Sequence, residues 1–279
     1  MTTPAAGNVS RLDGWWFLPP FRVLFLFVTL ALVLFITIPP VALLSLSLSQ
    51  QFDLVWGIFP SGISFDMYRD WGFQIFHSIG DSLRIALPVV VLSFLIGLPV
   101  AYALARLDFP GRALLGELVS IPMVFPPIVL AFGLMQLFGN GPLGFVGPWG
   151  AIIFGHTVVA IPFMIMPLVS ALHQIDPAYE DAALSLGAGR LRTVLTIVVP
   201  NVVPAIVTGM ALVFARSISD FEITLLLTTP EISTMPVEIY HAFESGSTRL
   251  GAAVSVATSL FSVAIIVLIE IVVRKAKWW

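Results

Sequence analysis

Apolar residues are gathered into six long runs, each about 20 residues or more, the length with which a helix crosses a hydrocarbon core of about 30 Å. Backbone polar groups must be paired inside lipid, and the sequence lacks the alternation of barrel strands, so we expect helices. Prolines inside the runs, Pro126 and Pro127 among them, indicate kinks. The pattern predicts an all-α membrane protein with spans near residues 21–48, 79–105, 113–138, 148–172, 202–226 and 250–273.

The basic residues divide unevenly between the two sides of such a chain. With a cytoplasmic N-terminus, nine of the thirteen lie toward the cytoplasm and four toward the outside. The cytoplasmic ones are Arg11, Arg22, Arg106, Arg112, Arg190, Arg192, Arg274, Lys275 and Lys277, and the outer ones are Arg69, Arg84, Arg216 and Arg249. Because short loops rich in Lys and Arg stay in the cytoplasm, we expect both termini there. The alternative is an odd number of spans, with one run lying flat on the membrane.

The polar connections are too short to hold a soluble domain, the longest being residues 49–78 and 226–250. We therefore expect a single membrane domain at residues 21–274. An N-terminal tail at 1–20 and a C-terminal tail at 275–279 would flank it in the cytoplasm.

The composition excludes several classes of function. The chain is 58% hydrophobic and 10% charged, far below the charged fraction of soluble domains, which is roughly 25%. It has no cysteine, which excludes disulfides, Cys-ligated zinc and thiol catalysis. Its net charge of −3 provides no basic stripe for a nucleic acid, so we expect no nucleic-acid partner.

The loop at residues 173–201, between the fourth and fifth spans, has the pattern of a short capped helix. Asp176 is a good N-cap and Pro177 suits the first helical position, while acidic residues follow in the first turn. Gly187 and Gly189 can take positive φ and end the helix. Such a helix is either a knob that fits a groove on a partner protein or an amphipathic connector at the membrane surface.

Part of this loop resembles the signature of ABC importer permeases: Glu-Ala-Ala, three residues, Gly, nine residues, Ile, one residue, Leu-Pro. Here Asp181-Ala182-Ala183 is followed at the same spacing by Gly187, Ile197 and Val199-Pro200, with Asp in place of Glu and Val in place of Leu. In that family the loop forms a coupling helix that docks on the ATP-binding subunit. The resemblance implies that role for Glu180, Asp181, Ala182, Ala183 and Gly187.

The resemblance covers nearly the whole chain and implies a six-span type I importer permease in the bacterial plasma (inner) membrane. The implied partners are two ATP-binding subunits, a second permease subunit (the same or a different chain), an extracytoplasmic solute-binding protein and the lipid bilayer. ATP and magnesium would bind the partner ATPase, and this chain would bind no cofactor. Residues 78–83, 214–222 and 234–240 look most like the spermidine/putrescine branch, and are also similar to the sulfate/molybdate, iron(III) and aminophosphonate branches.

Arg216, Asp220 and Glu222 are the candidate residues of the solute pathway. At 1.5 Å per residue, Arg216 would lie roughly 20 Å and Asp220 roughly 26 Å into the bilayer, where charges must face protein or water. Arg216 and Asp220 share a helix face and can pair, whereas Glu222 points elsewhere. The alternative is a buried pair that only holds the bundle together.

The outer half carries nine acidic and four basic residues, an excess that would concentrate a cation. We therefore expect a polyamine-like solute. An oxyanion, iron(III) or an aminophosphonate is the alternative, because Arg216 can hold an anion.

Other classes of membrane protein lack support in the sequence. The only lysines, Lys275 and Lys277, are not part of a phosphate-binding loop, so ATP hydrolysis would belong to another subunit. No zinc-protease motif or serine-hydrolase elbow is present, and we expect His156 to form a hydrogen bond between helices instead of acting in catalysis. We predict no catalytic residue and no metal site. A stand-alone secondary transporter remains the main rival, although no inverted repeat is visible.

Overall fold

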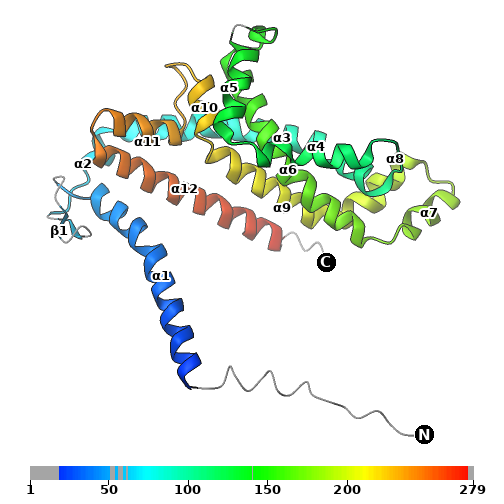
Figure 1. Cartoon of the computed structure of the whole chain (residues 1–279), viewed down its shortest axis with the longest axis horizontal. Helices are drawn as coiled ribbons and strands as arrows, with labels where there is room; N and C mark the ends of the chain where they lie inside the picture. Colours follow the sequence, from blue (N-terminus) through cyan, green and yellow to red (C-terminus); the bar gives the residue numbers. More distant parts are fainter. Residues whose placement is uncertain (1–18, 51–53, 56–58, 61, 140, 276–279) are drawn as a thin grey trace.

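The computed structural model describes residues 19–50, 54–55, 59–60, 62–139 and 141–275, and nearly all of them are helical (Figure 1). Among the described residues, the strands are β1 (Leu54–Val55) and β2 (Phe59–Pro60), a short antiparallel pair. The long helices are α1 (Pro19–Ser47), α3 (Gly72–Arg106), α6 (Gly147–Gln174), α9 (Val199–Ile218) and α12 (Thr248–Lys275). The shorter ones are α2 (Asp66–Asp70), α4 (Arg112–Val124), α5 (Pro127–Phe138), η1 (Gly144–Val146), α7 (Ala178–Ser185), α8 (Arg190–Thr193), η2 (Val194–Val198), α10 (Glu222–Leu227) and α11 (Met235–Glu244).

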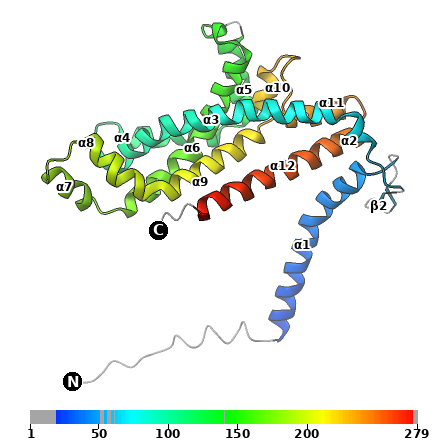
Figure 2. The same ribbon diagram turned by 180° about the vertical axis from the view of Figure 1, so that it is seen from behind.

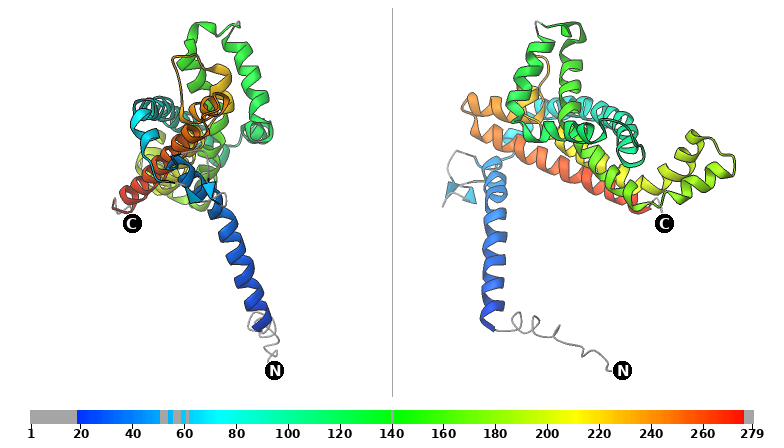
Figure 3. Two further views of the ribbon diagram at one scale, coloured as in Figure 1. Left: turned by 90° about the vertical axis from the view of Figure 1, so that its left-hand side faces the viewer. Right: turned by 45° about the vertical axis from the view of Figure 1, so that its right-hand side comes forward.

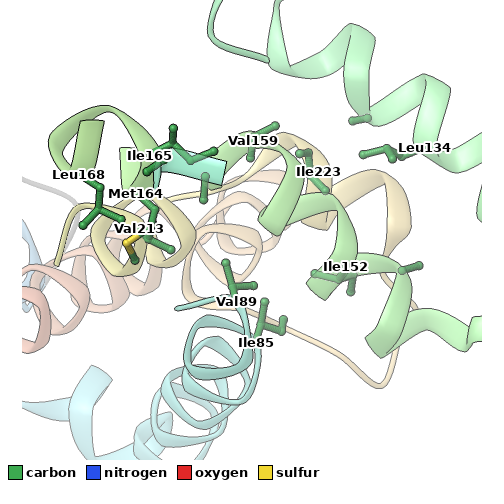
Figure 4. Packing of buried hydrophobic residues seen from close by; sticks show 14 of the residues in the cluster. Ile85, Val89, Leu134, Ile152, Val159, Met164, Ile165, Leu168, Val213 and Ile223 are labelled. Atoms are coloured by element: carbon green, nitrogen blue, oxygen red, sulfur yellow. The ribbon is translucent and has the colours of Figure 1, made fainter. Parts of the chain in front are cut away.

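The core lies where α3, α6 and α9 pack together (Figures 1 and 2). Branched and sulfur-containing side chains from the three helices fill it, with Met164 of α6 fully buried near Val213 of α9 (Figure 4). A Cβ added at Gly97 of α3 would lie 2.7 Å from Met164 Cγ, and one at Gly209 of α9 would lie 2.8 Å from Met164 Sδ. The two glycines therefore let their helices approach α6 closely, as is typical of packing in membranes.

Five helical segments are long and apolar enough to cross a membrane, and the bent pair of α4 and α5 makes up to six among the described residues. The kink predicted within the span at 113–138 is a full break, because α4 and α5 meet at an angle of 103°. Phe125 and Pro126 are both extended, with ψ of 140° and 131°. The residue before a proline disfavours the α region, and two successive prolines therefore break the helix instead of kinking it.

The fifth predicted span, 202–226, is displaced toward the N-terminus. Its helix runs from Arg190 to Ile218 and includes the π-turn η2, in which the Val199 N–H bonds to the Val194 carbonyl. The wider turn precedes Pro200, which lacks an N–H and would crowd the preceding turn of an α-helix. The apolar residues beyond the break at 219–221 belong to the separate helix α10.

Helix α1 lies apart from the bundle and contacts α12 (Figure 3). Every side chain at residues 21–41 is exposed in the isolated chain, although the segment is the most apolar of the candidate spans. The first predicted span is therefore a membrane helix by length and composition, and of its described side chains only Leu46 and Ser47, near its end, are buried. The tails expected at 1–20 and 275–279 fall almost wholly outside the described residues.

Candidate functional site

Helix α7 is capped at both ends by local hydrogen bonds. The Asp176 carboxylate Oδ1 accepts the backbone N–H of Ala178 at 2.9 Å, as expected of a capping residue. Gly187 has a φ of +85°, its N–H bonds to the Leu184 carbonyl, and the Ala188 N–H bonds to the Ala183 carbonyl. These two bonds define a Schellman motif, in which the left-handed residue is Gly187.

Gly189 differs from the prediction, because its φ of −72° and ψ of 152° are extended. The residue precedes α8 and begins the next helix instead of ending α7. Only Gly187, of the two glycines, therefore needs the conformational freedom that favours glycine.

The residues predicted to form the coupling helix do not all face the same way. Asp181 and Ala182 are exposed and Ala183 is half-buried, whereas the Glu180 side chain is only 10% exposed. Large apolar side chains lie on the outer surface of the same loop, with Leu186 89% exposed and Tyr179 64% exposed. Helix α7 projects from one end of the bundle, so this surface is a protruding knob with an apolar tip (Figure 3).

Glu180 binds two side chains near the end of α3. Its Oε2 accepts a hydrogen bond of 2.7 Å from the Tyr102 hydroxyl, and its Oε1 lies 2.8 Å from Arg106 Nε. The second contact is an ion pair without the alignment of a hydrogen bond. Arg106 also donates through Nη2 to the Ile175 carbonyl at 2.7 Å, just after α6. No pattern in the sequence indicated this inward orientation of Glu180.

The predicted pair of Arg216 and Asp220 is present. Arg216 Nη1 lies 2.8 Å from Asp220 Oδ2; the arginine side chain is 23% exposed and the aspartate side chain fully buried. Asp220 lies in the break after α9, where its Oδ1 accepts the Ile223 N–H at 3.0 Å and so orders the start of α10. Glu222 begins α10 and is half-buried. The three residues therefore surround a helix break instead of lying along one continuous helix.

His156 of α6 contacts both sides of this break. Its Nδ1 is hydrogen-bonded to Ser217 Oγ and its Nε2 to Thr224 Oγ1, both at 2.9 Å. Nε2 also lies 3.5 Å from Asp220 Oδ1. The expected hydrogen bond between helices is thus confirmed, and His156 extends the Arg216–Asp220 pair into a buried polar cluster. The one indication of these partners in the sequence is that hydroxyl residues, Ser217 and Thr224, lie before and after the break.

Replacing His156 with leucine should destabilise the packing of α6 against α9 and α10. The hydroxyls of Ser217 and Thr224 would lose their partner, which costs about 1–3 kcal/mol for buried polar groups. We expect a lower thermal midpoint for His156→Leu in detergent, while His173→Leu, at the exposed end of α6, should stay close to the wild type. Equal thermal midpoints for His156→Leu and His173→Leu would show that the hydrogen bonds of His156 do not stabilise the packing of α6 against α9 and α10.

Three of the nine acidic residues counted in the outer half are buried and bonded within the structure, whereas four others are exposed: Asp66, Asp70, Glu231 and Glu244. Asp81 is 1% exposed, and its two oxygens accept from Arg84 Nη1 at 3.2 Å and from the Ser233 N–H at 3.1 Å. Glu238 is 3% exposed and accepts from Gln74 and from the Ser233 hydroxyl. Asp220 is buried and paired as well, so these three carboxylates do not face a vestibule, while the exposed acids keep the outer half acidic.

These features define a class of protein: a multi-pass helical membrane protein with a protruding loop at one end and a buried polar cluster between its helices. Residues 93–278 match the family described as binding-protein-dependent transport system inner membrane component. The chain belongs to this family, and its fold is that of the type I importer permeases.

Several relatives match over most of their own length. The chain is 33% identical over 204 residues to the molybdenum transport system permease protein of Escherichia coli (strain K12), covering 66% of this chain and 88% of the relative. It is 32% identical over 218 residues to a probable molybdenum ABC transporter permease protein of Haloferax volcanii, covering 76% and 79%. It is 30% identical over 203 residues to a molybdate/tungstate transport system permease protein of Pyrococcus abyssi, covering 73% and 80%.

Solved structures have the same fold. A chain of a bacterial ABC transporter involved in the import of alginate superposes with a TM-score of 0.66 at 20% identity, over 96% of this chain and 99% of that chain. A chain of an alginate transporter in complex with its alginate-bound periplasmic protein gives a TM-score of 0.67 at 17% identity, over 91% and 94%. At these identities the likeness is one of fold.

Proposed function

We propose that this chain is the membrane subunit of an ATP-driven importer for a tetrahedral oxyanion of the molybdate or sulfate type. The observation that carries the proposal is the 33% identity to the E. coli molybdenum permease, since the alignment covers 88% of that protein. A sulfate transport system permease protein of Salmonella typhimurium is also 32% identical over 160 residues, or 57% of its length.

The polyamine-like solute expected from the sequence finds no support among these relatives, and the oxyanion alternative is better supported. The acidic count behind that expectation also included Asp81, Asp220 and Glu238, which are paired inside the protein and attract no cation from solution. Arg216 remains partly exposed beside its buried partner. We propose that Arg216, Asp220 and Glu222 belong to the solute pathway, with Arg216 as the group that attracts the anion.

The proposed partners are those of a binding-protein-dependent importer. Two ATP-binding subunits would dock on the knob around α7, a second permease subunit would complete the pathway, and an extracytoplasmic protein would deliver the solute. The alginate transporter solved with its periplasmic protein supports the last of these partners. We place both termini and the 173–201 loop in the cytoplasm on the charge bias, and ATP with magnesium on the partner subunits.

Alternating access is the proposed mechanism. Closure of the ATP-binding subunits would displace α7, and the packed bundle of α3, α6 and α9 would convert the displacement into an outward-facing cavity. The exposed apolar tip at Tyr179 and Leu186 supports docking at this end, because buried aromatic and aliphatic side chains anchor protein interfaces. A stand-alone secondary transporter has no need of such a knob.

Stimulation of ATP hydrolysis tests the proposal. The chain would be purified with its ATP-binding subunit and solute-binding protein and reconstituted in nanodiscs. Binding protein loaded with molybdate or sulfate should raise the ATPase rate, while binding protein offered spermidine should leave it at the basal level. Stimulation by spermidine alone would refute an oxyanion substrate, and failure to copurify with an ATPase would refute the importer assembly.

A further inference from the structure

Within the loop proposed to receive the ATPase, one charged residue faces the permease itself. The Glu180 carboxylate is nine-tenths buried, as is its ion-pair partner Arg106, and Tyr102 donates to its second oxygen. A surface that docks a partner protein offers its exposed groups, and on α7 these are Asp181 and the apolar tip. Glu180 therefore does not belong to the exposed surface that would dock the partner, unlike Asp181 beside it.

The contacts of Glu180 join three separate elements. Arg106 and Tyr102 lie in the last turns of α3, and Glu180 lies in the first turn of α7. The Arg106 guanidinium also bonds to the Ile175 carbonyl after α6. A groove of about 510 Å³, lined by Tyr102, Arg106, Glu180 and residues of α8, otherwise separates the loop from α3. The ion pair thus joins the end of α3 to the start of α7 beside this groove.

We propose that Glu180 is a positioning residue that transmits movement of α7 to α3. The inference rests on the coupling role proposed for α7. A buried carboxylate held at both oxygens cannot move without its partners, because separating the charges would leave each of them desolvated and unpaired. Displacement of α7 therefore carries Arg106 and the end of α3 with it. Since α3 packs along α6 and α9, the bundle receives the movement at this point.

The coupling ratio, the number of solute molecules imported per ATP hydrolysed, tests the proposal in the full reconstituted importer. Glu180→Gln and Arg106→Gln should each lower the ratio by roughly tenfold or more, because each variant leaves the other member of a buried ion pair without its charged partner, while ATP hydrolysis continues. The matched control is Asp108→Asn, which removes an exposed ion pair with Arg112 of similar length, 2.9 Å. Its coupling ratio should equal that of the wild type.

A double variant keeps the test valid if a single variant fails to assemble. Glu180→Gln combined with Arg106→Gln leaves no unpaired buried charge, so the complex should form, but without the ion pair its coupling ratio should stay roughly tenfold below that of the wild type. A wild-type ratio in assembled Glu180→Gln or in the double variant would overturn the proposal. Gly187→Val separates this proposal from the proposed function of the loop. If Glu180→Gln kept the wild-type ratio and Gly187→Val lost uptake, α7 would couple to transport without Glu180. If both variants imported at the wild-type rate, the coupling role proposed for α7 would be wrong as well.

Discussion

Replacing Gly187 with valine should abolish ATP-dependent uptake while the chain remains in the membrane. Gly187 has a φ of +85°, and a β-branched residue there costs about 1–3 kcal/mol or more of backbone strain. Relief of that strain would break the two hydrogen bonds that end α7 and would shift Leu186 and Asp181. We expect uptake to fall by roughly tenfold or more, since each 1.4 kcal/mol is a factor of ten in an equilibrium.

Gly189 provides the matched control for this prediction. It lies two residues away and is equally open to an added side chain, since a Cβ at either glycine would meet no atom within 4 Å. Its extended backbone accepts valine without strain, so Gly189→Val should import at close to the wild-type rate. Equal uptake by the two variants, measured in the same vesicles, would show that the left-handed turn is not needed for coupling.

The second large effect should come from replacing Arg216 with leucine. Asp220 would remain as a fully buried carboxylate without its cation, and breaking such a pair costs about 3–5 kcal/mol. We expect Arg216→Leu to reduce the amount of assembled protein severely. The exposed pair of Arg69 and Asp70 offers a control, because Arg69→Leu with Asp70→Asn removes a surface contact worth about 0–1 kcal/mol.

A double variant separates the structural role of this pair from a role in transport. Arg216→Leu with Asp220→Asn contains no unpaired charge, and the asparagine oxygen can still accept the Ile223 N–H. Assembly should therefore recover. If Arg216 attracts the solute, the recovered protein will still fail to import an oxyanion. Uptake at the wild-type rate by the double variant would instead assign the pair to packing alone, and Glu222→Gln in the same assay would test the remaining residue.

The sequence predicted the approximate place of the membrane helices because apolar length is a local property. It could not predict the 103° bend at Phe125 and Pro126, since a hydropathy pattern is the same for a straight span and a broken one. The shift of the fifth span has a similar cause. Pro200 looks like a helix start, and only the structure reveals the π-turn that carries the helix past it.

The candidate site was predictable where it depends on neighbours in the chain and not where it depends on distant ones. The cap at Asp176, the turn at Gly187 and the pairing of Arg216 with Asp220 follow from spacings of a few residues. Glu180 meets Tyr102 and Arg106, more than 70 positions earlier, and His156 meets Ser217 and Thr224, more than 60 positions later. Such contacts require the packed bundle, as does the burial of Asp81, Asp220 and Glu238, three of the nine acids whose charge suggested a cationic solute.

Direct uptake is the measurement that tests the central claim most closely. Proteoliposomes containing the chain with its ATP-binding subunit would receive binding protein and labelled molybdate, sulfate or spermidine outside, with ATP or a non-hydrolysable analogue inside. We predict accumulation of an oxyanion only with ATP and only with binding protein. Accumulation of spermidine with no uptake of either oxyanion, or oxyanion uptake that needs neither ATP nor binding protein, would contradict the account.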